Sequence, residues 1–359
     1  MNFIISILFS GIAVSVIVLI PWICIGAIDG AFMRSLFGII IPYAAIATFL
    51  VGIVVRVISW SRSPVPFRIP TTAGQEWSFP WIKSNPIDNP KGMGGVILRM
   101  IFEVLLFRSL FRNTRLEYLN DENGPKINYE WEKWLWLAAL AFHYSFLVIF
   151  LRHFRFFLDP IPGFVHVLES LDGFMQLGIV PFNGFGMPGV YITDGILLAA
   201  VTYLFIRRIY IHSVRYISLP ADYFPLFMIL GLGLTGVLMR YAIRVDITAV
   251  KELSVSLFQF SPKVPDGIGV IFFIHLFLLC VLIAYFPFSK LMHMAGIFLS
   301  PTRNMANNNR FIRHVNPWNY PVKFHTYAAY EDEFREKMIE AGIPVEKGVE
   351  ATSESDKKE

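Results

Sequence analysis

Charged residues are scarce in this chain of 359 residues. They make up 16% of it, whereas 55% of the residues are hydrophobic. Water-soluble domains carry nearer a quarter charged residues. Several apolar runs reach about 18 residues or more, the length that crosses the hydrocarbon core of a bilayer as a helix. The sequence therefore predicts a membrane protein with several spans and excludes an ordinary water-soluble domain.

Cysteine is also scarce, since Cys24 and Cys280 are the only two. Two cysteines are too few for an iron–sulfur cluster or a disulfide framework, and we interpret both as core residues. The first ten residues, MNFIISILFS, lack a basic stretch and a cleavage site. We therefore expect a retained first span and not a removed signal peptide. The sequence also lacks a P-loop, a serine–histidine–aspartate set and a zinc motif, and its net charge of +4 does not indicate nucleic-acid binding.

The apolar runs predict an all-α, polytopic membrane bundle of six spanning helices. Their predicted bounds are 3–24, 36–60, 132–157, 192–212, 222–245 and 268–290. The predicted division of the chain is two N-terminal spans (1–60), a cytoplasmic loop with an interfacial helix (61–131), a four-helix membrane core (132–292) and a cytoplasmic tail (293–359).

Basic residues are unevenly distributed among the loops. Between Arg155 and Arg207 there is no lysine or arginine, whereas 61–131 carries nine basic residues and the chain after His293 carries nine more. Loops rich in lysine and arginine stay on the cytoplasmic side of the membrane. We therefore predict a protein of the cytoplasmic membrane with both termini in the cytoplasm.

The segment Val96–Arg115 is apolar enough to suggest a seventh span, but it contains four charged residues before its end. Each of them would cost about 2.5–3.5 kcal/mol at the centre of the bilayer. We predict an interfacial helix, or a docking surface for a cytoplasmic partner.

Four histidines lie in or next to the predicted third and sixth spans: His143, His153, His275 and His293. Ten residues of helix separate the first two, a rise of about 15 Å. Because the two spans run antiparallel, His153 is expected to lie level with His275, and His143 with His293. Two imidazoles that face one another across a bundle are typical axial ligands of a six-coordinate haem iron. Neutral imidazole binds iron without bringing a charge into the low-dielectric core.

One distance does not fit this scheme without a break in the helix. The eighteen residues from His275 to His293 would rise about 27 Å as a straight helix. Pro287 can kink or end that helix and shorten the distance.

Two other functions stay open, a transporter that uses the histidines as a proton relay and a haem-less membrane anchor. The other four histidines are predicted in loops, turns or the tail: His166, His212, His314 and His325.

The histidine spacings of ten and eighteen, together with PFSKLMH (Pro287–His293), resemble the gamma subunit of respiratory nitrate reductase, a membrane cytochrome b. The resemblance implies two haem b groups. The distal, outer haem would use His153 and His275, and the proximal, inner haem would use His143 and His293.

A resemblance over nearly the whole chain is to the DsrM family, the cytochrome b subunits of DsrMKJOP membrane complexes. The motifs that carry it are PVPFRIPTTAGQ (Pro64–Gln75), LLFRSLFRNTR (Leu105–Arg115) and LRHFRFF (Leu151–Phe157). Members commonly have a cysteine where this chain has Ala73, so no role is assigned to that loop.

The DsrM resemblance implies electron transfer from menaquinol, oxidised near the distal haem, to the proximal haem. The expected acceptor is a cytoplasmic iron–sulfur partner, the heterodisulfide reductase-like DsrK. The trisulfide of the sulfur carrier DsrC would be the final acceptor in sulfite or sulfur metabolism. DsrJ, DsrO and DsrP are the further expected partners.

The quinol site is expected next to His153. Its nearest polar neighbours in the sequence are Arg152, Arg155, Asp159 and His166. A quinol needs a base or hydrogen-bond partner for its hydroxyl groups. The two arginines can equally contact a haem propionate or extend from a helix end to the membrane surface. Apart from quinol oxidation we expect no bond-making chemistry in this chain.

Overall fold

The computed structural model describes residues 3–28, 30–63, 81, 83, 85–122, 124–173, 191–307 and 325–346. The motif at 64–75 and His314 lie outside these residues. The chain divides into two compact units, Met1–Trp60 with Arg68–His314, and Ser61–Phe67 with Val315–Glu359. The second unit contains α16 (Tyr327–Glu340), whose buried Glu331 pairs with Arg335 at 2.9 Å.

The first unit contains the membrane helices. Among the described residues, five helices are long and apolar enough to cross a membrane. They are Phe3–Gly26 (α1), Ala31–Ser61, Lys133–Phe157, Pro220–Tyr241 (α11) and Val270–Phe288. Ala31–Ser61 consists of α2 (Ala31–Ser35), a π-helical turn η1 (Leu36–Ile40) and α3 (Ile41–Ser61). Lys133–Phe157 consists of α6 (Lys133–Arg152) and α7 (Phe154–Phe157), and Val270–Phe288 consists of α13 (Val270–Tyr285) and a 3₁₀ turn η4 (Phe286–Phe288). The predicted helical membrane bundle is confirmed.

The predicted fourth span, 192–212, differs from these five. The segment does form a helix, α9 (Ile192–Tyr210), but it carries Asp194, Arg207 and Arg208 near its two ends. These charges leave it less apolar than the other long helices, so the count of six spans is not confirmed. Arg207 pairs with Glu132 at the start of α6 at 2.7 Å, which joins α9 to α6.

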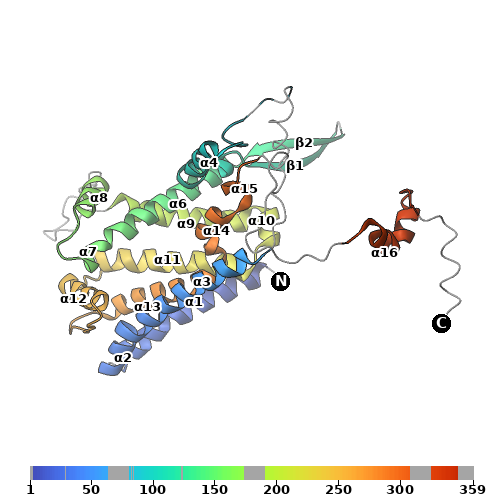
Figure 1. The fold of residues 1–359 in the computed structure, drawn as a ribbon. Helices are drawn as coiled ribbons and strands as arrows, with labels where there is room; N and C mark the ends of the chain where they lie inside the picture. The colour runs from blue at the N-terminus through green and yellow to red at the C-terminus, as the bar shows by residue number, and fades with distance from the viewer. Residues whose placement is uncertain are drawn as a thin grey trace. The chain divides into compact units, whose positions relative to one another are not determined.

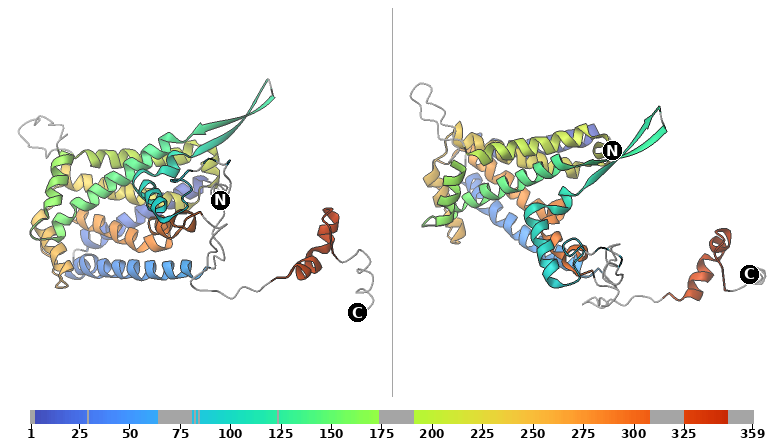
Figure 2. Two further views of the ribbon diagram at one scale, coloured as in Figure 1. Left: turned by 45° about the horizontal axis from the view of Figure 1, so that its top comes forward. Right: turned by 90° about the horizontal axis from the view of Figure 1, so that it is seen from above.

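The long helices lie side by side in the order α6, α9, α11, α13, with α1 packed against both α11 and α13 (Figures 1 and 2). Their apolar side chains meet in a buried cluster that includes Val14, Val201, Met228 and Leu278. The backbone of α6 packs closely against α9 and approaches α13 far less. The two histidine-bearing helices are therefore bridged mainly by side chains.

Short helices and turns lie at both ends of the bundle (Figure 1). At one end are α7, α8 (Gly163–Gly173) and α12 (Ile247–Phe258). At the other are α10 (His212–Ile217), a 3₁₀ turn η5 (Lys290–Met292), α14 (His293–Leu299) and α15 (Pro301–Asn304). These are called the α8 end and the hairpin end below.

A β-hairpin, which the sequence analysis did not predict, occupies the end of the expected loop. Strands β1 (Thr114–Asp121) and β2 (Gly124–Trp131) pair antiparallel in a register that joins Thr114 to Trp131. Gly124 adopts a φ of +96°, which favours glycine and allows the tight turn. The all-α description therefore holds for the membrane bundle but not for this loop.

The segment predicted to be an interfacial helix contains the helix α4 (Met93–Leu106), which is too short to span and whose charged face is turned inward. Arg99 is buried, and its Nη2 donates to the carbonyl oxygens of Arg303 at 2.6 Å and Met305 at 2.8 Å. Glu103 is buried as well and pairs with Arg303 at 3.3 Å. The outer face of α4 is apolar and exposed, as Ile97 and Ile101 show.

Residues 293–307 belong with this membrane unit, which differs from the predicted division at residue 293. The contacts of Arg99 with Arg303 and Met305 attach α15 to α4.

Phe107, whose backbone is in the left-handed conformation, joins α4 to the short helix α5 (Arg108–Phe111). Beside α5, a hydrogen bond from Arg108 holds the pKa of the Asp88 carboxyl below its usual value.

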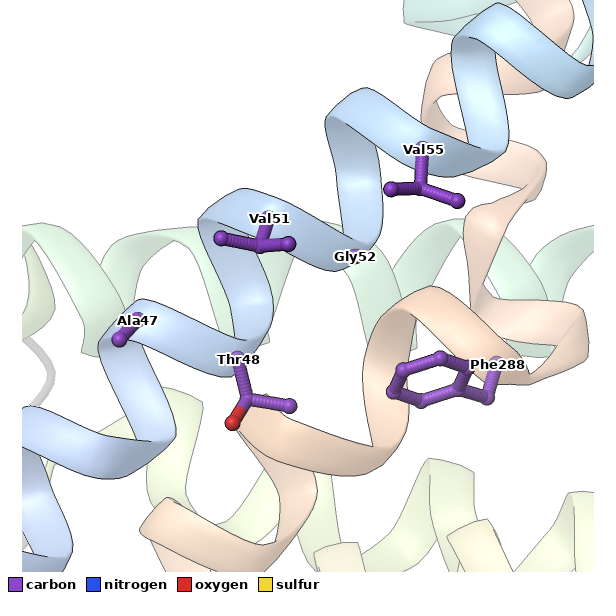
Figure 3. A pocket seen from close by; sticks show the side chains of 6 residues that line it. All are labelled: Ala47, Thr48, Val51, Gly52, Val55 and Phe288. Atoms are coloured by element: carbon purple, nitrogen blue, oxygen red, sulfur yellow. The ribbon is translucent and has the colours of Figure 1, made fainter.

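Gly52 lets α3 approach the turn at Pro287. A Cβ added at Gly52 would lie 2.7 Å from Pro287 Cβ and 2.8 Å from its Cγ, in a rigid ring. The same stretch of α3 borders an open apolar groove with Phe288, in which no ionisable side chain takes part (Figure 3). The close contact, rather than the groove, supports the turn that leads to His293.

We expect Gly52→Ala to push α3 away from the Pro287 turn and to destabilise the protein by about 1–3 kcal/mol, as overpacking usually does. Thermal unfolding in detergent measures this. Gly195→Ala in α9 is the control, because nothing lies within 4 Å of its added Cβ. Equal melting temperatures for the two variants would contradict the close contact.

Candidate functional site

The first histidine pair joins α6 and α13 towards the α8 end of the bundle. His153 follows the last residue of α6, and His275 lies in the second turn of α13. Their ring centroids are 6.5 Å apart, and the ring planes are nearly parallel, at 6°. The structure thus brings together two residues that are 122 positions apart in the chain.

The second pair lies towards the hairpin end. His143, in the middle of α6, and His293, the first residue of α14, have ring centroids 6.0 Å apart with the planes at 85°. Phe107 packs edge-to-face against His143 at 4.9 Å.

The break at Pro287 accounts for the spacing that a straight helix could not satisfy. Helix α13 ends at Tyr285, ten residues after His275, so it rises about 15 Å between them. That is the same rise as from His143 to His153. The 3₁₀ turns η4 and η5 then take the chain to His293 without extending the helix further.

Each imidazole is oriented through its Nδ1 atom, which lies within hydrogen-bond distance of an oxygen. The partners are the carbonyl oxygens of Ala139 (2.7 Å from His143), Ile149 (2.6 Å from His153) and Lys290 (2.9 Å from His293), and the hydroxyl of Thr235 (2.8 Å from His275). A carbonyl can only accept, so the Nδ1 atoms of the first three rings carry the proton. In the neutral ring this leaves the Nε2 lone pair free to bind a metal.

Thr235 fixes the same tautomer in His275. Its hydroxyl lies 2.8 Å from the carbonyl oxygen of Gly231, one turn earlier in α11, and donates its proton there. The hydroxyl oxygen therefore accepts from Nδ1–H of His275. The sequence analysis missed this residue because a threonine in a span usually makes only the bond to the preceding turn.

Thr235→Val keeps the shape of this side chain and removes the acceptor. Loss of such an orienting partner typically weakens metal binding by about 10–100-fold. We therefore expect haem to transfer faster from this variant to apomyoglobin. Thr48→Val is the control, since the Thr48 hydroxyl bonds only within α3, to Ala44. Equal transfer rates would show that Thr235 does not support His275.

The two pairs fit haem iron on three counts. A metal–imidazole bond is about 2 Å, so two rings that bind one ion from opposite sides have centroids about 6 Å apart. His143 and His153 lie among the helices, but both residues are solvent-accessible, so open space adjoins them. Among the described residues, no three histidine, cysteine, aspartate or glutamate side chains gather around one point. Two protein ligands per site suit a haem, whose porphyrin supplies the others, and not a structural zinc ion.

Arg152, next to His153, is the centre of a buried ion cluster. Its guanidinium pairs with Asp172 of α8 at 2.9 Å and with Asp194 of α9 at 2.8 Å, and it stacks on Tyr191 at 3.9 Å. Tyr241 of α11 donates to Asp194 at 3.0 Å. The cluster joins α6, α8, α9 and α11 beside the first histidine pair. The sequence analysis named Arg152 but neither aspartate, because they are remote in the sequence.

The other three residues named for the quinol site lie nearer the surface of the α8 end. Arg155 pairs with Glu169 of α8 at 2.6 Å, and the exposed Asp159 pairs with Lys251 of α12 at 3.0 Å. His166 is exposed on α8. All four residues thus lie at the end of the bundle near His153, and Arg152 alone among them is buried.

Comparison with known proteins gives one family match that contains this site and two similar relatives. Residues 102–313, more than half of the chain and including all four histidines, match the nitrate reductase gamma subunit family. The "Hdr-like menaquinol oxidoreductase cytochrome b-like subunit" of Archaeoglobus fulgidus is 43% identical over 290 residues, 79% of this chain and 83% of the relative. The protein of the same description from Archaeoglobus profundus is 43% identical over 284 residues, 77% of this chain and 81% of the relative.

Proposed function

Because this chain belongs to the nitrate reductase gamma subunit family, we propose that it is the cytochrome b subunit of a quinone-linked oxidoreductase complex in the cytoplasmic membrane. The single observation that carries the proposal is the pairing of two histidines of the α6 segment with one histidine of α13 and one of α14, with ring centroids 6.5 and 6.0 Å apart.

Each histidine pair would hold one haem b through its Nε2 atoms. His153 and His275 are assigned to the distal haem, and His143 and His293 to the proximal one. When bound, the two haem groups supply reversible one-electron carriers at two depths, which divides a barrier of about 30 Å. The hydrogen bonds to Nδ1 hold the rings in the tautomer that binding requires.

The proposed substrate is menaquinol, as the names of both relatives indicate for those proteins. Its site is placed at the α8 end, next to His153. Arg155, Asp159 and His166 supply candidate hydrogen-bond partners for the quinol hydroxyls. Arg152 is paired with Asp172 and Asp194, so its proposed role is to position α8 and His153.

The complex is proposed to contain a cytoplasmic iron–sulfur subunit of the DsrK type. DsrC trisulfide would be the terminal acceptor, and DsrJ, DsrO and DsrP would be further subunits. The basic loops support a proposed topology with the hairpin end and both termini in the cytoplasm. In this arrangement α9 also spans the membrane and brings the number of spans to six, with Asp194 and Arg207 at its two ends paired to Arg152 of α6 and to Glu132.

The test is a reduced-minus-oxidised spectrum and a pyridine haemochrome count on the purified chain, followed by reduction with a menaquinol analogue. Two haem b groups reduced by the quinol are expected. One haem would refute one of the pairs, and a folded chain without haem would refute the proposal in favour of a proton relay or an anchor.

A further inference from the structure

The β-hairpin has one apolar face that is largely exposed: at its base, Trp131 contacts Phe111 and Lys133. Side chains of directly opposed residues in an antiparallel pair lie on the same face. The register therefore places five large apolar side chains together: Leu116, Tyr118, Ile127, Tyr129 and Trp131. Between 52% and 69% of each is exposed.

The other face of the hairpin is polar and internally paired. It carries Arg115 opposite Glu130, at 2.5 Å, and Glu117 opposite Asn128. Arg115 pairs with Glu117 as well. Exposure to water is therefore favourable for this face, whereas exposure of the apolar face costs free energy.

The apolar face is large enough to be an interface. Five side chains of this size, each more than half exposed, present roughly 500 Å² together. Exposed patches of that size on soluble surfaces are often binding sites. A stable protein interface buries about 800 Å² on each partner, so the patch could supply most of one side. Tyrosine and tryptophan are also the residues that most often dominate interface energies.

The hairpin projects outward from the membrane bundle. Strand β2 ends at Trp131, one residue short of α6, and the hairpin extends beyond the ends of α9 and α11 (Figures 1 and 2). Eight residues of strand reach about 27 Å from the end of α6, so in the proposed topology the hairpin extends out of the hydrocarbon core. An apolar face that extends away from the bilayer meets water, and so it needs a protein and not a lipid surface to cover it.

The base of the hairpin is fixed to the helices that hold the proximal histidine pair. Glu132, between β2 and α6, pairs with Arg207 of α9, and both side chains are nearly buried. His143 lies eleven residues farther along α6. A protein seated on the hairpin is thereby positioned at the end of the bundle nearer His143 and His293.

We propose that the apolar face of the hairpin is the docking surface for the water-soluble iron–sulfur subunit that exchanges electrons with the proximal haem. This rests on the proposed function. The partner surface would be apolar with few charges, since no charged side chain lies among the five residues of this face.

The test introduces the same charge at neighbouring residues that point to opposite faces. Ile127→Lys places it in the apolar patch, and Asn128→Lys places it on the polar face, opposite Glu117. Each tagged chain is purified from its own membranes with its complex. Haem, non-haem iron with acid-labile sulfide, and subunit ratios by mass spectrometry are then measured.

We expect Ile127→Lys to retain its haem and to lose about tenfold or more of the iron–sulfur subunit and its non-haem iron, the size of a hot-spot effect. Tyr118→Lys should repeat this loss, and Asn128→Lys should match the unaltered chain. Menaquinol oxidation with ferricyanide as acceptor should be unchanged in all of them.

Three results would overturn the docking surface. These are full retention of the iron–sulfur subunit by Ile127→Lys, equal loss in Asn128→Lys, or a change only in the number of copies of this chain, which would assign the face to a second copy. Absence of haem from the unaltered chain would instead refute the proposed function, so the two failures are distinguishable.

Discussion

Replacing His275 by alanine should lower the haem b content of the purified chain from two groups to one and abolish menaquinol-dependent reduction of the haem that remains. The distal site would keep only His153, since no other described imidazole lies opposite it at comparable distance. His153 would then be the one axial ligand of a haem that is held by two. We expect the distal haem to be lost from the variant for that reason. The proximal pair, on other turns of α6 and α13–α14, should stay loaded.

The reciprocal variant makes this prediction specific. His293→Ala should empty the proximal site and leave the distal haem reducible by quinol. His166→Ala is the matched control, because it removes an exposed imidazole from α8 and should keep both haems. Loss of the same spectroscopic component from the His143→Ala and His153→Ala variants would contradict the assignment of one pair to each depth.

Arg152→Leu should destabilise the protein by about 3–5 kcal/mol, because it leaves two carboxylates buried without their cation. Asp172 and Asp194 have side chains only 3% and 14% exposed. The ion cluster also positions His153, so the distal haem should be lost at a lower temperature than the proximal one. Thermal unfolding followed at the haem absorption bands measures both effects.

Arg155→Leu is the control for this variant. Arg155 is also an arginine paired to a carboxylate of α8, but its side chain is 33% exposed. Pairs of that kind contribute about 0–1 kcal/mol. Similar losses of stability in the two variants would show that Arg152 acts as a surface charge and not as the centre of a buried cluster.

The apolar runs predicted four of the five long helices to within about four residues, and the Ala31–Ser61 helix begins five residues earlier than expected. Hydrophobic length is a property of the local sequence, and a helix in a membrane satisfies its own backbone hydrogen bonds. The pairing of histidines by depth could be predicted for the same reason, because the helical rise and the antiparallel direction are nearly independent of side-chain packing.

The hairpin and the inward charged face of α4 were not predictable in this way. The alternation of apolar and polar residues in TRLEYLND and GPKINYEW is typical of strands. Nothing else in the sequence supports a hairpin there, because its apolar face does not pack into the core of the bundle. An interfacial helix would turn Arg99 and Glu103 towards water, because an unpaired charge avoids burial. Their partners on α15 lie some 200 residues away, and only the folded chain brings them together.

The sequence by itself determined that this protein is a helical membrane bundle and which four imidazoles lie at matching depths. The reason is that span length and helical rise depend on local composition alone. The tertiary structure decided that the chain turns at Pro287 to bring His293 to His143, that Thr235 orients His275, and that Arg152 is held by two distant aspartates. These depend on contacts between helices, which are set by close packing and by the need to pair every buried charge.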